Sequence, residues 1–444
     1  MSANIALVQE NKSAVQTEQC PECHSHVAAH PNFMSWCECG WNLKPHRQEH
    51  APSMFASFYE RLGQRVGKQL LSDMEVLEHL MPKPSKTKLF TIVMATVVHA
   101  ISLAMVLLCL FALSIYREYP VLAILAVPML ILLWTQRPRI PKLSKDEKRD
   151  IVPREQFPSL YAFSDQIADY LHMPHFEGIL IDEEFNASYR QVGLKQKRYL
   201  TLGLPLFSIL SPAEKAALIG HEAGHGINGD STRNLYTFTA IITLENWFRL
   251  LASRGEDEVL VEGNLFGLVS NVVGMLMRMV SFIPQLLIKL FIHSIYYESQ
   301  KAEYMADYLG AKVGGTEGAI GLSRKMFCET TFVLSGQRFV LRGAKGNYFD
   351  ELKAAVGSIP PREIERIRRV EMMEGSTLDR THPPTAYRIQ TLQHHAQLAP
   401  GAIQLTGEQL KQLERELSAV EAKLQERLVN LLKEKLYKKP IHQG

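Results

Sequence analysis

The sequence has 444 residues and a formal net charge of +3, and this charge is too small to indicate a nucleic-acid-binding protein. Its mean hydropathy is close to zero, but that mean combines strongly apolar blocks with charged ones, as in a membrane protein with a sizeable aqueous domain. Four of the six cysteines lie in one short N-terminal window, which favours a metal site over a disulfide framework. Because the first long apolar block begins near residue 89, we expect no secretory signal peptide.

Two cysteine pairs indicate a zinc-ribbon-like module at residues 1–45. Cys20 and Cys23 form the first pair, and Cys37 and Cys39 form the second. Four thiolates can make a closed tetrahedral zinc site that replaces the hydrophobic core of so short a module, so we expect one structural zinc ion here. The second pair has one intervening residue rather than two, which leaves a histidine ligand, two disulfides or free thiols as alternatives. The candidate histidines are His24, His26 and His30.

Two apolar blocks at residues 89–135 follow a linker of mixed composition at 46–88. Residues 89–116 are nearly uncharged and long enough to cross a bilayer with some tilt, whereas the second block, 119–134, is short for a span. We interpret the pair as a transmembrane helical hairpin. His99 lies in the first block, and we expect a neutral side chain that is hydrogen-bonded across the hairpin.

Basic residues on both sides of the hairpin predict its orientation. The turn between the two blocks contains Arg117 beside Glu118, whereas both outer flanks are rich in lysine and arginine. Because positively charged flanks stay in the cytoplasm, the pattern predicts a multi-pass cell-membrane protein whose large C-terminal part faces the cytoplasm. The flanking residues are Lys83, Lys86 and Lys88 before the hairpin and Arg137, Arg139, Lys142, Lys145, Lys148 and Arg149 after it.

Residues 150–210 are typical of the start of an α+β domain. The spacing of apolar residues predicts a helix over 157–171 and short strands near 178–181 and 199–202. We expect the strand just before the next helix to form a sheet edge along which an extended peptide can pair, near Asn186 and Ala187.

Capping residues predict that the next helix begins near residue 212. Ser211 is a favourable N-cap, Pro212 suits the first helical position, and Glu214 completes a capping box. Gly226 and the following Asn228 and Gly229 predict that the helix ends shortly after residue 225.

This predicted helix carries the string His221-Glu222-Ala223-Gly224-His225. Residues four apart on a helix share one face, so His221 and His225 can direct imidazole nitrogens at one metal ion. A zinc ion held by two histidines and one further ligand keeps a position for water, and a nearby carboxylate such as Glu222 can accept the proton of that water. A chance occurrence of the string is the alternative, and the capped helix argues against it.

The region after this helix contains apolar blocks at 236–251 and 265–295 and then an acidic pair. The block at 265–295 is compatible with a membrane span, a re-entrant or interfacial helix pair, or a buried core helix, and we favour membrane association. Glu303 and Asp307 share one face of the helix that follows. Spacing alone leaves two interpretations open: a third metal ligand with a supporting carboxylate, or a solvated acidic face.

Two further features lie near the C-terminus. His382 stands on a rigid turn formed by Pro383 and Pro384, from which it could donate a hydrogen bond to a developing oxyanion. Residues 396–444 contain a highly charged helix with a leucine stripe, which we interpret as a docking or short coiled-coil face. The stripe consists of Leu410, Leu413, Leu417, Val420, Leu424 and Leu431.

Taken together, these motifs resemble the HtpX-like and CAAX prenyl protease-type family of membrane zinc metallopeptidases over roughly residues 155–395. The resemblance implies that His221, His225 and Glu303 bind a catalytic zinc ion and that Glu222 is the general base. It also implies that His382 contacts the transition state and that Asp307 and Asp230 support the ligands. The matching residues are the H-E-x-x-H string with Asp230, Glu303-x-x-Ala306-Asp307, Asn186-Ala187, and Thr381-His382-Pro383-Pro384 with Arg388.

The sequence therefore predicts a mainly α (α+β) protein with a zinc metallopeptidase domain at 150–395. We expect an endopeptidase that cleaves polypeptides on the cytoplasmic side of the membrane, with a role by resemblance in membrane-protein quality control. One alternative is a catalytically silent scaffold that recruits protein partners through the ribbon or the C-terminal helix. Another is a protease whose H-E-x-x-H string lies inside the bilayer, although the polar residues around the string argue against it.

Overall fold

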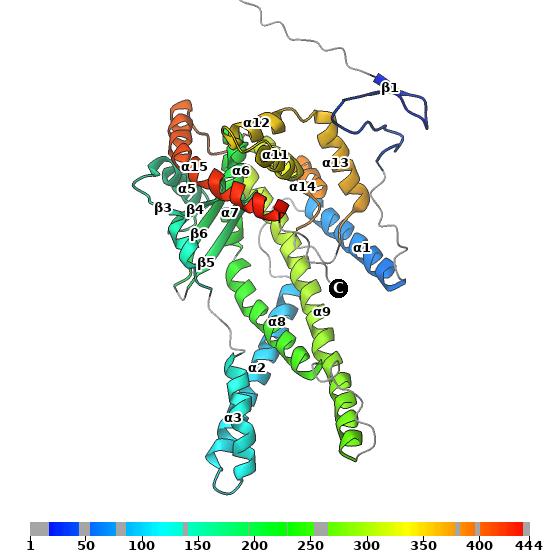
Figure 1. Ribbon diagram of the computed structural model, residues 1–444, viewed down its shortest axis with the longest axis vertical. Coiled ribbons are helices and arrows are strands. Elements are labelled where there is room, and N and C mark those ends of the chain that lie inside the picture. Colours follow the sequence, from blue (N-terminus) through cyan, green and yellow to red (C-terminus); the bar gives the residue numbers. More distant parts are fainter. Residues whose placement is uncertain are drawn as a thin grey trace, which may run out of the picture.

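Helices dominate the fold and two small sheets complete it, as the computed structural model shows (Figure 1). This confirms the mainly α (α+β) class expected from the sequence. The structure describes residues 17–43, 54–76, 86–135, 141–193, 195–228, 230–252, 265–377, 382–395 and 400–437. Of these, residues 54–59, 230–235, 265–271 and 273 are described by their backbone.

The N-terminal part contains a small hairpin and one helix. Strands β1 (Thr17–Gln19) and β2 (His26–Ala28) pair antiparallel in the cysteine-rich module. The range 46–88, expected to be a linker, contains helix α1 (Met54–Val76). Leu70, Leu71 and Met74 of α1 pack against buried tyrosines of the C-terminal half. Charged and apolar residues are mixed in this segment, so its mean hydropathy does not show that one face of the helix is apolar.

Several long helices extend away from the part of the molecule that holds the four-stranded sheet (Figure 1). Helix α2 and the Gly274–Gly314 part of α9 are long and apolar enough to cross a membrane, whereas α3 is shorter. On α2 the side chains of Leu107, Leu108 and Phe111 are exposed, which indicates contact with lipid in a helix this apolar. The extending helices are α2 (Lys86–Ser114), α3 (Pro120–Thr135), α8 (Asp230–Ala252) and α9 (Leu265–Gly314).

His99 contacts α8 rather than the other helix of the expected hairpin. Its Nε2 atom lies 3.1 Å from the carbonyl oxygen of Tyr236 and 3.4 Å from Oγ1 of Thr239. The expected hydrogen bond across the hairpin is therefore wrong. Helices α2 and α8 are far apart in the sequence, so the sequence pattern contains no signal for this pairing.

A four-stranded sheet supports the site. Its order is β3 (Ile151–Val152), β4 (Gly178–Asp182), β6 (Lys197–Gly203) and β5 (Ala187–Val192), with β4 and β6 parallel and the other neighbours antiparallel. Both predicted strands are present. The strand just before the next helix is β6, which is paired on both sides, so the edge lies at β5 instead. The polar sequence of β5 alternates too weakly to predict a strand. Short helices around the sheet are α4 (Lys145–Arg149), α5 (Pro158–Tyr170) and α6 (Leu204–Ser208).

Helix α7 (Pro212–Ile227) packs closely against the C-terminal part of α9 because both helices have glycine at the contact. A Cβ atom on Gly310 would lie 2.7 Å from the carbonyl oxygen of Ala217, and one on Gly314 would lie 2.3 Å from that of Ala213. The residues 265–295 and 303–307 belong to this one continuous helix α9. The close approach brings the acidic pair of α9 to the histidines of α7.

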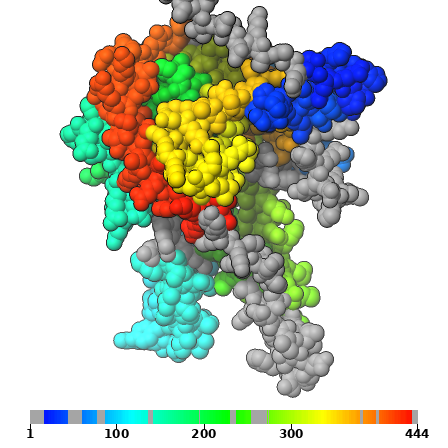
Figure 2. All heavy atoms as spheres, turned by 45° about the horizontal axis from the view of Figure 1, so that its top comes forward, coloured from blue at the N-terminus to red at the C-terminus, as the bar shows by residue number. Residues whose placement is uncertain are grey.

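The C-terminal helices complete the domain, and α15 belongs to its core. Leu413, Leu417, Leu424 and Leu428 are buried in the same cluster as the sheet residues, and Figure 2 shows α15 (red) along the yellow α11. The leucine stripe thus packs on its own chain, which corrects its interpretation as a coiled-coil face. These helices are α10 (Thr316–Met326), α11 (Glu329–Leu341), α12 (Tyr348–Gly357), α13 (Pro361–Glu374), α14 (Thr385–His394) and α15 (Gly407–Tyr437).

Candidate active site

Helix α7 has the predicted capping box. The Oγ atom of Ser211 accepts from the backbone N–H of Glu214 at 3.4 Å, and the Glu214 carboxylate accepts from the backbone N–H of Ser211 at 2.7 Å. The helix ends at Ile227 with Asn228 as its C-cap, close to the predicted end. The two histidines therefore lie in the last turns of a helix whose start is fixed by its own sequence.

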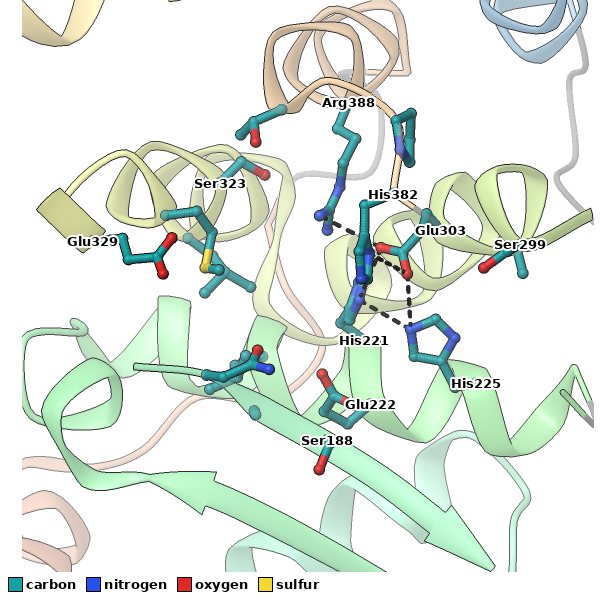
Figure 3. Close-up of a pocket in the computed structure, with 18 of the residues that line it drawn as sticks. Ser188, His221, Glu222, His225, Ser299, Glu303, Ser323, Glu329, His382 and Arg388 are labelled. Atoms are coloured by element: carbon teal, nitrogen blue, oxygen red, sulfur yellow. Dashed lines mark hydrogen bonds and ion pairs between the residues drawn. The ribbon is translucent and has the colours of Figure 1, made fainter. Parts of the chain in front are cut away.

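His221 and His225 direct their Nε2 atoms at the same point. These atoms are 3.2 Å apart, and the two rings are nearly perpendicular, at 86°. His221 is buried and His225 is half-buried. Figure 3 shows both rings turned toward Glu303 of α9.

Glu303 completes a set of three groups that could hold a metal ion. Its carboxylate oxygens lie 3.6 Å from Nε2 of His221 and 3.5 Å from Nε2 of His225, and the three donor atoms lie within 4.8 Å of one another. The Oε2 atom of Glu303 is buried and lies 3.4 Å from Nη1 of Arg388, but it accepts no hydrogen bond from any part of the chain that the structure describes. Two imidazoles and one carboxylate are a donor set suited to zinc, and a cation among them would satisfy this oxygen. The residues therefore fit a zinc ion.

Asp307 and Arg388 form a buried pair behind His221. The Asp307 carboxylate accepts two hydrogen bonds from Arg388, at 2.7 and 2.6 Å, and its Oδ1 lies 3.0 Å from Nδ1 of His221. Burial lowers the pKa of the Arg388 guanidinium, but the adjacent Asp307 carboxylate more than offsets this and raises that pKa above its ordinary value. The pair fixes the orientation of His221, a function known for carboxylates behind metal-binding histidines. This role of Arg388 was not predicted from the sequence, where its position in the motif after His382 was the available signal.

A cavity of about 950 Å³ opens in front of these residues. Glu222 lines it from α7, and Asn186, Ala187 and Ser188 line it from the edge strand. In Figure 3 the Glu222 carboxylate lies on the side of the histidines that faces Ser188. The cavity also reaches Lys88 at the start of α2, so it extends to the base of the apolar helices.

Two predicted site residues remain, His382 and Asp230, and the structure describes the side chain of His382 alone. His382 lines the cavity, and its Nδ1 atom lies 2.8 Å from Oε1 of Glu303, while about two thirds of its side chain is exposed. It thus meets a candidate ligand directly, and a contact with an oxyanion stays a prediction. Asp230 opens α8, and its side chain lies outside the described residues.

The N-terminal cysteines form a second candidate metal centre. The Sγ atoms of Cys20, Cys23, Cys37 and Cys39 lie within 4.8 Å of one another, and none of the four is in a disulfide. The histidines considered as alternative ligands do not belong to this cluster among the described residues. Four sulfurs at this separation suit a structural zinc ion.

Comparison with known proteins identifies the family. The sequence pattern described as peptidase family M48 matches residues 156–396, more than half of the chain. The chain belongs to peptidase family M48. Protease HtpX homologues from Pyrobaculum islandicum and Pyrobaculum calidifontis are each 26% identical to it, over 246 and 257 residues, which is 53% of this chain and 67% of each relative. This M48 peptidase is therefore an HtpX-like, membrane-associated metalloprotease. The matched range contains the three candidate ligands, Glu222 and the edge strand β5, and it excludes the ribbon, α1 to α4, β3 and α15.

Proposed function

We propose that this M48 peptidase is a zinc-dependent endopeptidase in which His221, His225 and Glu303 hold the catalytic ion. One observation carries the proposal: the donor atoms of these residues lie within 4.8 Å of one another, and one buried oxygen among them lacks a hydrogen bond within the described chain. When bound, zinc would supply a Lewis acid that polarises the scissile carbonyl and makes the attacking water more acidic.

Glu222 is the general base in this proposal. It lies next to His221 in the sequence and faces the cavity, where it accepts the proton of the attacking water and passes it to the leaving amine. Asp307 and Arg388 hold His221 in one orientation during these steps. His382 stays close to Glu303 and faces the same cavity, where a carbonyl oxygen would develop negative charge.

We propose that the substrate is a polypeptide bound in extended form along β5. Asn186 accepts from the N–H of Gly203, so the residues paired within the sheet are the even-numbered ones of β5. In an antiparallel pair, backbone groups of alternate residues point to the other side. The N–H and C=O groups of Ala187 and Tyr189 therefore point toward the open edge, where a substrate strand can pair with little dependence on its side chains.

The charged flanks of the apolar helices support a proposal for the side of the membrane on which the reaction takes place. Basic residues lie before and at the start of α2 and after α3, which supports a multi-pass arrangement with the site on the cytoplasmic side. The cavity reaches the base of α2, so a cytoplasmic site would lie near the membrane surface. We therefore propose membrane proteins under quality control as substrates. We further propose a second, structural zinc ion in the four-cysteine cluster.

The substitution Glu222→Gln tests the proposed activity. Glutamine keeps the shape of the side chain but cannot accept the proton, so cleavage of an unfolded protein such as casein should fall about 10²- to 10⁴-fold. Zinc content should remain at the wild-type level, because Glu222 is not among the proposed ligands. Purified full-length protein in detergent is the sample, and mass spectrometry gives the metal content.

Glu426→Gln is the matched control, because Glu426 is exposed on α15 and should retain full activity. If Glu222→Gln cleaved casein at the wild-type rate, the proposed base would be wrong. If the wild-type protein bound zinc but cleaved nothing, the catalytically silent scaffold would be the better account.

A further inference from the structure

The N-terminal ribbon docks on helix α13 through one buried tryptophan. Trp36, which directly precedes the ligand candidate Cys37, is about 1% exposed. Its Nε1 atom donates to the carbonyl oxygen of Arg362 at 3.3 Å, and Nη2 of Arg362 donates back to the carbonyl oxygen of Trp36 at 2.7 Å. Figure 2 shows the ribbon (dark blue) beside the golden α13. The ribbon is therefore attached to its own chain at this face.

Cation–π contacts and an ion pair add to this attachment. The guanidinium carbons of Arg362 and Arg369 lie 4.2 and 4.9 Å from the centre of the Trp36 ring system. Arg369 also forms a salt bridge with Glu38, which lies between two of the cysteines. A guanidinium at this distance from an indole is attracted by the ring face, and more strongly where water is excluded. Trp36 thus interacts with two residues of α13 that lie about two turns apart.

Helix α13 itself has little other support from the core. None of its residues is buried, although Ile364 packs partly against the main cluster and Met372 against the cluster that contains Leu70 of α1. Its C-terminal end is held by the Glu371 carboxylate, which accepts from the backbone N–H of Ala386 at 3.0 Å, and by Gln64 of α1, which donates to the carbonyl oxygen of Glu374 at 3.5 Å. The contacts of the ribbon therefore add support at the N-terminal turn and the centre of α13.

The opposite side of α13 forms part of the cavity. Ile367 and Glu371 line it together with His382. Through its bond to Ala386, α13 also contacts the start of α14, whose Arg388 is held separately by Asp307 of α9. The candidate ligands come from α7 and α9, which contact each other directly and do not require α13. A displacement of α13 would therefore alter the wall of the substrate cavity more than the candidate metal centre.

From these contacts we infer that the ribbon is an intramolecular brace that positions the α13 wall of the substrate cavity, with Trp36 as the positioning residue. The inference rests on the proposed function, since it concerns the same cavity. The ribbon has a very small core, formed by Cys20, Val27 and Cys37 with Trp41 against them, so its fold depends on the four-cysteine cluster. The placement of Trp36 depends in turn on that cluster, and the ribbon acts on substrate binding without contacting substrate.

Trp36→Ala in the full-length protein tests the brace. We expect KM for a peptide substrate to rise about tenfold, while kcat stays within about twofold, because the ligands and Glu222 are unaffected. Amide hydrogen exchange over 361–374 should become faster. Trp36→Phe keeps an aromatic ring beside the two arginines and should bring the KM part of the way back to the wild-type value. Met34→Ser is the matched control, because Met34 is exposed in the same loop and should behave as wild type.

Two results would overturn the inference. One is a Trp36→Ala protein with wild-type KM and wild-type exchange over 361–374. The other is a fall of kcat with loss of zinc from the His221 site, because Trp36 would then support the general fold rather than the cavity wall. If the wild-type protein showed no hydrolysis, the proposed function would fail, and the exchange measurement alone would decide whether Trp36 holds α13.

Discussion

Asp307 connects a candidate zinc ligand to a buried arginine, and its substitution should weaken metal binding. In Asp307→Asn the side chain loses the charge that pairs with Arg388 and that favours the Nδ1–H form of His221. Changes to carboxylates behind a metal-binding histidine typically reduce metal affinity about 10- to 100-fold, and we expect a loss of this size. Competition with a chromogenic zinc chelator measures it.

Asp350→Asn is the control for this measurement, since Asp350 is exposed on α12 and should leave the affinity unchanged. An Asp307→Asn protein that held zinc as tightly as wild type would show that the orientation of His221 does not depend on this carboxylate.

The residues of the site differ in how far the sequence predicts them. His221 and His225 lie on one helix at a spacing that itself places them on one face, so geometry and sequence agree. Glu303 lies on another helix, and its spacing to Asp307 fits a solvated face equally well. The family resemblance, rather than any periodicity, indicated it. The contact between Asp307 and Arg388 depends on how α9 meets α14, which no local pattern encodes.

At the scale of elements, the site depends on the close approach of α7 and α9. We expect Gly310→Ala to destabilise the protein by about 1–3 kcal/mol and to reduce zinc content, because the added Cβ would push α9 away from the backbone of α7 at Ala217. Gly357→Ala is the control, since a Cβ there meets nothing within 4 Å. Thermal unfolding and metal analysis measure both effects. Equal zinc content and equal stability in the two variants would contradict the role of glycine in this contact.

Elements whose bounds depend on nearby residues could be predicted from the sequence, whereas features that depend on tertiary contacts could not. The capping box of Ser211 and Glu214 defines the start of α7 from four residues. The edge position of β5 follows from the order of the sheet, which the sequence of β5 does not specify. The sequences of amphipathic helices such as α1 and α15 indicate an apolar face, but they do not predict which part of the protein packs on that face.

At the scale of the whole molecule, α15 is joined to the peptidase domain by a long-range cap. Helix α5 lacks a side-chain cap of its own, and the buried Glu416 carboxylate accepts from the backbone N–H groups of Ser159 at 2.9 Å and Leu160 at 3.0 Å. Glu416→Ala removes this partner from the buried N–H group of Leu160 and the half-buried N–H group of Ser159. We expect the free energy of unfolding to fall by about 2–4 kcal/mol, because each N–H group that loses its partner costs about 1–3 kcal/mol and the structure relaxes in part.

Thermal unfolding of Glu416→Ala beside Glu426→Ala tests this cap, because Glu426 is exposed on the same helix. Equal unfolding temperatures for the two variants would indicate that α15 contributes little to the domain, and an interaction with another protein would again be a reasonable role for it.

The protein is expected to have two separate metal centres, and its zinc content tests this most directly. Purified wild-type protein should contain about two zinc ions per chain, one at each donor set. Glu303→Ala should contain about one and be inactive, and Cys37→Ala should also contain about one but lose the ion of the ribbon. If Glu303→Ala retained both ions at full occupancy, Glu303 would not be a ligand, and the proposed catalytic centre would be wrong.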